Sequence, residues 1–230
     1  MQRYKPVSTT IFSSTILASS LFLMGSTAAA QTDGPQGWYL KPTLALSQLS
    51  DQTPNTLAVG VLDGPANVTL GTGFASGLVL GYAYGGPWSA ELGWEYRSND
   101  SEVALADGQR FSDGNYASNT FFANAQYHFQ PVGTTQAWQP YAGFGLNFIQ
   151  EIDIDLETPV RELSYADDAD TGFQLFAGIE RKLSADWSIL GEIRYTRFSD
   201  LDLSGENTGG LFRGLDYTPV SLQLGLKYRF

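Results

Sequence analysis

Residues 220–230, VSLQLGLKYRF, alternate between apolar and polar side chains over their whole length. The apolar positions are Val220, Leu222, Leu224, Leu226, Tyr228 and Phe230, and the others are Ser221, Gln223, Gly225, Lys227 and Arg229. Successive side chains of a β-strand point to opposite faces, whereas the pattern of a helix repeats every 3.6 residues. This stretch therefore predicts a strand with one apolar and one polar face.

The same period of two recurs in seven stretches upstream: residues 38–50, 74–84, 88–97, 120–130, 141–156, 172–182 and 187–196. A tilted strand needs about 9–11 residues to cross a bilayer, and each stretch is long enough. Short connections at 85–87, 131–137 and 183–186 alternate with long ones at 51–72, 99–117, 157–171 and 200–216. This arrangement predicts an all-β fold, an eight-stranded antiparallel up-and-down transmembrane β-barrel.

The composition excludes several classes of function. The formal net charge is −11, and a negative surface repels phosphate backbones, so we expect no nucleic-acid partner. The chain has no cysteine, which excludes disulfides, thiolate metal sites and cysteine nucleophiles. Its one histidine, His128, is too few for a multi-histidine metal centre. We expect neither a cofactor nor a firm metal site.

Residues 1–30 have the pattern of a cleaved secretory signal peptide. Arg3 and Lys5 supply the positive start, residues 11–24 form the apolar segment, and Ala28 to Ala30 form a small-residue cleavage site. A retained membrane anchor would need about 20 mostly apolar residues, and this run is shorter and interrupted by serines. The barrel domain is therefore predicted to be residues 31–230.

Alternation alone does not show which face meets lipid, because a soluble lipocalin-like barrel alternates equally well. Ten charged residues of both signs lie on the polar faces of the strands and predict a paired charge network in the lumen. They are Lys41, Glu91, Glu95, Arg97, Glu180, Lys182, Glu192, Arg194, Lys227 and Arg229. Trp38, Trp88, Trp138 and Trp187 all flank short connections, as expected of an aromatic girdle at a membrane interface.

The stretch 141–156 carries its apolar residues at even positions throughout. These are Ala142, Phe144, Leu146, Phe148, Ile152, Ile154 and Leu156, and we expect them to share the lipid-facing side. The odd positions include Glu151, Asp153 and Asp155, which we count with the acidic extracellular segments and their strand extensions.

Together, the signal peptide, the eight amphipathic strands, the acidic long connections and the terminal residues 226–230 resemble the small outer-membrane β-barrels. The similar families are the OmpA membrane domain, OmpX and the opacity-type surface proteins. The resemblance implies a monomer in the bacterial outer membrane, in contact with outer-membrane lipid and lipopolysaccharide. It also implies that Leu226, Tyr228 and Phe230 form the signal that the barrel-assembly machinery recognises.

We expect a structural or surface-interaction role, with a plugged polar lumen and acidic extracellular loops. The alternative is a small-solute porin, although eight strands leave an interior only wide enough for side chains. A lipid A-modifying enzyme is the third possibility. Acyl transfer by such an enzyme needs a nucleophile beside a base. His128 shares the lumen-facing parity of Asn124 and Gln126 and lacks the His-x-Ser arrangement of the lipid A deacylases. We expect it to be hydrogen-bonded to a carboxylate or amide, with no catalytic residue in the chain.

Two further sites lie near the expected extracellular rim. Asp153, Asp155 and Glu157 share one strand face at a spacing of about 7 Å, too wide for one strand to enclose an ion without help from other loops. They are weak candidates for divalent cations or a cell-surface partner, and the alternative is a solvated rim. Arg197 continues the lipid-facing parity of residues 187–195, where it would meet a lipopolysaccharide phosphate or pair with Asp200.

Overall fold

The computed structural model describes residues 36–133, 137–158, 161–167, 170–206 and 209–230, and the predicted signal peptide lies outside them. The strands are β1 (Gly37–Gln48), β2 (Asn55–Leu57), β3 (Gly64–Pro65), β4 (Asn67–Ala83), β5 (Trp88–Ala104), β6 (Arg110–His128), β7 (Trp138–Thr158), β8 (Arg161–Asp167), β9 (Thr171–Lys182), β10 (Trp187–Gly205), β11 (Leu211–Tyr217) and β12 (Val220–Arg229). None of the described residues forms a helix that is long and apolar enough to cross a membrane.

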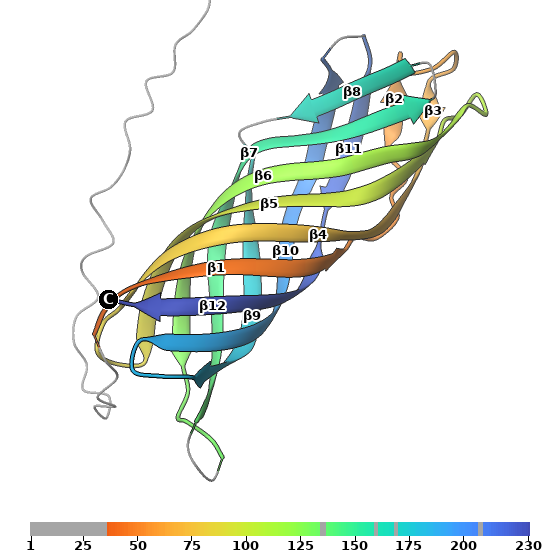
Figure 1. Cartoon of the computed structure of the whole chain (residues 1–230). Helices are drawn as coiled ribbons and strands as arrows, with labels where there is room; N and C mark the ends of the chain where they lie inside the picture. The colour runs from red at the N-terminus through yellow and green to blue at the C-terminus, as the bar shows by residue number, and fades with distance from the viewer. Residues whose placement is uncertain (1–35, 134–136, 159–160, 168–169, 207–208) are drawn as a thin grey trace, which may run out of the picture. The chain divides into compact units, whose positions relative to one another are not determined.

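The pairings close eight of these strands into a ring, and Figure 1 shows the resulting barrel. The order around the ring is β12, β1, β4, β5, β6, β7, β9 and β10, and β10 pairs with β12 to complete it. All of these pairings are antiparallel. The prediction of an all-β, eight-stranded, up-and-down barrel is confirmed, and four further strands lie beyond the ring.

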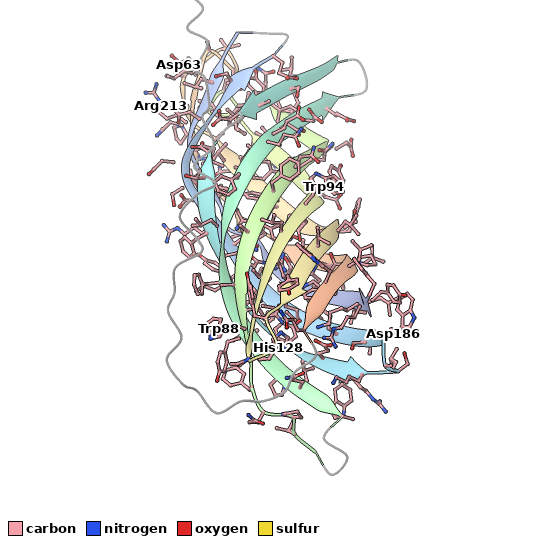
Figure 2. The ribbon with its side chains drawn as sticks, turned by 90° about the vertical axis from the view of Figure 1, so that its left-hand side faces the viewer. Asp63, Trp88, Trp94, His128, Asp186 and Arg213 are labelled. Atoms are coloured by element: carbon pink, nitrogen blue, oxygen red, sulfur yellow. The ribbon has the colours of Figure 1, made fainter. Side chains whose placement is uncertain are left out.

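The two ends of the barrel differ. Short connections join β4 to β5, β6 to β7 and β9 to β10 at the end that carries Trp88 and His128, which we call the short-turn end (Figure 2). The opposite end carries Asp63 and Arg213, and we call it the long-hairpin end. Phe230 N–H donates a hydrogen bond to the Trp38 carbonyl at 3.2 Å, so β1 and β12 also meet at the short-turn end.

Aromatic side chains surround the outside of the short-turn end. The four tryptophans expected there, at positions 38, 88, 138 and 187, are all exposed. Trp88 lies against Tyr127 with ring centroids 5.1 Å apart, and Trp187 lies against Tyr228 at 4.7 Å. Such a ring of amphipathic aromatic groups is typical of a membrane interface.

Alternation along β1 and β12 follows the prediction from the sequence. Leu44 and Leu222 point outward and are 68% and 63% exposed, whereas Lys41 and Lys227 point inward and are buried. A large exposed apolar surface is costly in water but not in lipid. The outer face of the ring therefore forms an apolar band.

The long connections are largely strands, which the sequence reading did not predict. β4, β5, β6, β7 and β10 run well beyond the apolar band, and β8 and β11 fold back on β7 and β10. β2 and β3 add a small hairpin next to β11. In the expected loop 99–117 only a tight turn remains, where Leu105 N–H bonds to the Gln109 carbonyl at 2.9 Å. The long-hairpin end is thus an extension of the barrel wall rather than a set of loops.

An apolar core fills the inside of this extension. Its buried members are Leu49, Ala66, Val68, Leu70, Val103, Leu105, Phe111, Tyr116, Ile149, Ile152, Ile154, Leu156, Leu163, Tyr165, Phe198, Leu201, Leu203, Phe212, Leu215 and Tyr217. Most come from β4, β5, β6, β7, β8, β10 and β11, and Leu49, Ala66 and Leu105 lie just outside the strands. We call this set the extension core.

A β-bulge in β7 overturns the expected face of three residues. Asn119 pairs with Glu151 and Thr120 pairs with Ile149, so Gln150 is an extra residue in β7. Such an insertion reverses which side chains face inward. Phe148, below the bulge, is exposed as expected, but Ile152, Ile154 and Leu156 belong to the extension core. Glu151, Asp153 and Asp155 consequently face outward and not into the lumen.

The wall of the extension is open along a seam between the β1–β12 pairing and the β2–β11 pairing. β1–β12 and β2–β11 keep the same register, yet the intervening residues 49–54 and 214–219 share no backbone pairing within the described part of the chain. Gln52 instead exchanges two backbone hydrogen bonds with Val68, both 2.9 Å long. Its side-chain Oε1 then accepts a hydrogen bond from Asp216 N–H at 3.1 Å. One amide side chain thus bridges the gap that the backbone leaves.

Candidate functional site

Buried charged side chains occupy the barrel interior nearest the short-turn end. Four cations and four carboxylates lie there, none more than 7% exposed: Lys41, Arg97, Arg194, Lys227, Glu91, Glu95, Glu180 and Glu192. They project from β1, β5, β9, β10 and β12. Burying a charge is unfavourable unless an opposite charge and hydrogen bonds compensate for lost water. The equal numbers of the two signs satisfy the first of these conditions.

Two of the ten predicted members of this network lie elsewhere. The prediction for Lys182 is wrong, because its side chain is exposed at the last residue of β9. Arg229, the last residue of β12, is only half-buried. Both lie at the rim of the short-turn end; Lys182 is exposed there, whereas the Nε of Arg229 is buried without a hydrogen-bond partner in the described part of the chain. The sequence pattern, with six cations and four carboxylates, would have left two positive charges uncompensated.

Glu91 is the centre of the first cluster. Lys41 Nζ lies 2.6 Å from Glu91 Oε1, and Tyr39 Oη donates a hydrogen bond to the same oxygen at 3.0 Å. Asn124 Nδ2 donates to the other carboxylate oxygen at 3.1 Å. The carboxylate therefore has three donors from two strands, β1 and β6, and because Glu91 itself projects from β5 it links these three strands across the lumen.

Arg194 is the centre of the second cluster. Its Nη2 lies 2.6 Å and its Nε 3.0 Å from Glu192 Oε1, and Tyr141 Oη donates to Glu192 Oε2 at 3.0 Å. Arg194 Nη1 is 3.6 Å from Glu95 Oε2, which gives an ionic contact without a hydrogen bond. The guanidinium lies between the rings of Phe122 and Phe176, at 5.0 and 5.4 Å from their centroids. Cation–π contacts thus replace part of its lost hydration.

The large rings around Arg194 fit only because glycines face them. A Cβ on Gly93 would overlap the Phe122 ring, and a Cβ on Gly143 would overlap the Phe176 ring. The outer end of each ring therefore occupies the space beside a glycine of the neighbouring strand. The rings could have been assigned to the lumen from sequence, because Phe122 shares the parity of Asn124 and Gln126.

Arg97 connects the charged interior to the wall where β1 pairs with β12. Its Nη2 bonds to Glu95 Oε1 at 2.5 Å. Its Nη1 donates to Ser47 Oγ at 2.5 Å and to Ser221 Oγ at 2.7 Å. Ser47 and Ser221 pair directly across β1 and β12. Arg97 thus bonds to side chains on both of the strands that close the ring.

Lys227 and His128 lie closest to the short-turn end. Lys227 Nζ forms an ion pair with Glu180 and lies 4.8 Å from the centre of the Tyr39 ring. His128 Nε2 lies 3.2 Å from Ser89 Oγ. The expected partner of the histidine was a carboxylate or amide, so this prediction is corrected to a hydroxyl. Ser89 is 2% exposed and His128 Nδ1 is buried without a hydrogen-bond partner in the described chain, so the pair lacks both an orienting acid and an open approach.

The outward carboxylates of β7 do not form a metal cage. Among the described residues, no group of three or more histidine or acidic side chains is placed to hold a metal ion. Asp153, Asp155 and Glu157 are partly buried at alternate positions on the outer surface of the extension. Partial burial, with repulsion from Asp155, Glu151 and Glu206, raises the pKa of Asp153 to about 7. This group is therefore close to half-protonated at neutral pH.

The remaining predicted residues also lie on the outside. Leu226, Tyr228 and Phe230 are exposed in a row at the short-turn end. Arg197 is exposed beyond the apolar band, and its Nε donates a hydrogen bond to Ser199 Oγ at 3.1 Å. The structure records this serine contact rather than an ion pair between Arg197 and Asp200.

The apolar outer band, the aromatic girdle and the compensated interior charges define an integral β-barrel of the bacterial outer membrane. The family described as Outer membrane protein beta-barrel domain matches residues 17–230, so the chain belongs to this family. Its location is the bacterial outer membrane. Short turns of such barrels face the periplasm, so the short-turn end is periplasmic and the long-hairpin end is extracellular.

One solved structure shows the same fold at a TM-score above 0.5, and others are similar at lower scores. OprG from Pseudomonas aeruginosa is 17% identical, with a TM-score of 0.62 over 84% of this chain and 96% of OprG. Neisserial surface protein A is 13% identical, with a TM-score of 0.49 over 84% of this chain and 97% of that protein. Ail of Yersinia pestis is 13% identical, with a TM-score of 0.42 over 85% of this chain and 100% of Ail. The protease OmpT of Escherichia coli is 10% identical, with a TM-score of 0.42, and this similarity gives no argument for catalysis. No curated protein sequence matches the chain.

Proposed function

We propose that the protein is a sealed barrel with a structural and surface-interaction role, and that it neither transports solutes nor catalyses a reaction. One observation carries this proposal: side chains occupy the interior at both levels. Ion pairs and aromatic rings fill the periplasmic half, and the extension core fills the extracellular half. A water-filled passage would have to displace both layers.

The acidic outer surface of the extension supports a role at the cell surface. Exposed carboxylates project from several of its strands and from the segment after β1: Asp51, Asp100, Glu102, Asp113, Glu151, Asp202 and Glu206. The core beneath them fixes their positions, so a partner would meet a preformed surface. We propose that this surface engages divalent cations or a basic group on a cell-surface partner.

Assembly of the barrel is part of the same proposal. The outward row of Leu226, Tyr228 and Phe230 is accessible before the strand meets lipid, as a signal for the barrel-assembly machinery requires. We propose that the folded product is a monomer, because the ring closes on itself and leaves no unpaired edge within the membrane.

Conductance tests the sealed lumen. We expect purified, heat-modifiable protein in planar bilayers to produce no steps of the size given by a water-filled pore. A large-pore porin in the same bilayers is the positive control. Regular steps in single-protein recordings would contradict the proposal and support the small-solute channel.

A further inference from the structure

A small groove crosses the outer surface of the barrel where the apolar band ends on the extracellular side. It has a volume of about 240 Å³ and lies across β10, β12 and β1 and the edge of β4. Leu46, Ile193, Val220 and Leu222 form its apolar part, and all four are exposed. The groove faces the outer leaflet, because it lies on the outer side of the wall and at the extracellular limit of the band.

Polar groups lie along the extracellular lip of the groove. Gln48 and Thr72 line it there, and Thr72 Oγ1 donates a hydrogen bond to Gln48 Oε1 at 3.0 Å. This amide and hydroxyl lie where the hydrocarbon gives way to the ester level of a lipid. They sit in the row of Val220, directly above the row of Leu46 and Leu222.

A cation lies one row further out. Tyr195 pairs with Val220 across β10 and β12, and Arg197 follows two residues along β10, at about 7 Å. Among the described residues, Arg197 is the one cation that β1, β10 and β12 present on their outer faces above the groove. Its Nε is engaged by Ser199, which leaves the two Nη groups of the guanidinium to bind an anion.

We propose that this groove and Arg197 together bind one phosphorylated lipid of the outer leaflet, with an acyl chain in the groove and a phosphate on the guanidinium. Along the protein surface, the apolar groups are followed by the amide and hydroxyl and then by the guanidinium. This order matches the tail, ester and phosphate of such a lipid. A free phosphate would gain nothing from the apolar part, so the occupant is a lipid. The site does not depend on whether the lumen conducts, so this proposal and the proposed function fail independently.

Fluorescence quenching tests the site in the full chain folded into vesicles. The chain has no cysteine, so a Phe74→Cys variant carries one bimane label. Phe74 pairs with Leu46 beside the groove without lining it. The quenchers are phosphatidic acid and phosphatidylcholine with the same brominated acyl chains. We expect phosphatidic acid to quench at roughly fivefold lower mole fraction, because one surface arginine favours an anionic lipid by about that factor.

Matched variants separate the two parts of the site. Arg197→Gln should remove the preference for phosphatidic acid, whereas Arg213→Gln, at another exposed arginine of the extension, should leave it unchanged. Val220→Trp should fill the groove and weaken quenching by both lipids. A label at Leu146→Cys, on the outer face of β7, should show no preference.

Several results would overturn the proposal. They are equal quenching by the two lipids in the Phe74→Cys protein, loss of the preference in Arg213→Gln, or the same preference at Leu146→Cys. Competition by millimolar inorganic phosphate would also do so, since it would show an anion site without a lipid. Heat-modifiable mobility of every variant verifies that each has folded.

Discussion

The barrel has two interiors of opposite character, built from the same strands. In the periplasmic half, β10 directs Glu192 and Arg194 inward and Ile193 outward. In the extracellular half, the same strand directs Leu201 and Leu203 inward and Asp202 outward. The surroundings explain the inversion: lipid requires an apolar exterior, which leaves the polar side chains inside, whereas water outside the extension favours the usual apolar core.

The transition between the halves coincides with irregularities in the strands. β7 has its bulge at Gln150, and β4 shifts register between Leu70 and Gly73. The register shift of β6 lies further out, between Phe111 and Gly114, beyond Tyr116 of the extension core. In β10 the shift follows Phe198, and Asp200 there has a φ of 59°. A bulge changes the face to which the following side chains point. The apolar residues of one strand can therefore face outward in the periplasmic half and inward in the extracellular half.

Deleting Gln150 should have the largest effect, because it breaks the inversion directly. Without the extra residue, Ile152 and Ile154 would face water, and Asp153 and Asp155 would enter the extension core. We expect the extension to lose its structure while the ring remains, seen as rapid trypsin cleavage at Arg213 in vesicles. Gln150→Ala keeps the residue count and should stay resistant. Equal resistance of both variants would show that the bulge does not set the face.

Glu192→Ala tests the periplasmic interior. It leaves Arg194 buried without its closest carboxylate, which should cost about 3–5 kcal/mol of unfolding free energy. Urea unfolding in lipid vesicles measures this loss. Ile193→Ala, on the lipid side of the same strand, should cost less because lipid fills the space. The reverse order would mean that the faces of β10 are wrongly assigned.

Ile154→Ala tests the extracellular interior. Ile154 is fully buried in the extension core, and removing its side chain should cost about 2–4 kcal/mol through lost burial and a residual cavity. The same unfolding assay applies, and hydrogen exchange should show the loss in β7, β8 and β11 rather than in β1 and β12. A cost below that of Ile193→Ala would argue against a packed core here.

Asp153 gives the extension a pH dependence. Its pKa in the folded protein, about 7, is raised above the ordinary carboxyl value, so the folded state retains a proton that the unfolded chain loses from about pH 4. The associated stability is fully present below about pH 4 and is lost progressively as the pH rises from about 4 to about 7. Asp153→Asn should match the wild type at about pH 3 and be more stable by about 1 kcal/mol at about pH 8, after solvent screening. Asp113→Asn is the exposed control, and a constant difference between the two pH values would contradict the assignment.

Gln52→Ala should have the smallest effect. It removes the hydrogen bond that bridges the seam and should cost about 1 kcal/mol or less, since water can replace the amide at an outer wall. Hydrogen exchange of the Asp216 N–H should become faster, with little change at Val68, whose bonds are to the Gln52 backbone. Unchanged exchange at Asp216 would show that the seam is held by other contacts.

The sequence by itself determined the ring. Period-two alternation in residues 220–230 and in the other seven stretches set the strands, the lipid face and eight of the ten lumen charges. These features are local, because each depends on which side of a strand a residue occupies. Even so, the partners of the charges, such as Tyr39 for Glu91 and Phe122 for Arg194, required the cross-strand registers that only the fold supplies.

Only the tertiary structure decided what lies beyond the membrane. Alternating apolar residues such as Leu201 and Leu203 were present in the expected loops, but nothing in the pattern shows that Ile154 changes sides after Gln150. A bulge is recognised only against the partner strand, here β6, which is distant along the chain. Where water replaces lipid outside the wall, apolar side chains become more stable inside the barrel than outside it. The period of the sequence shows that two faces alternate, but it does not show which solvent surrounds them. For that reason the strands could be predicted, whereas the apolar core of the extension and the neutral balance of the lumen emerged only from the folded barrel.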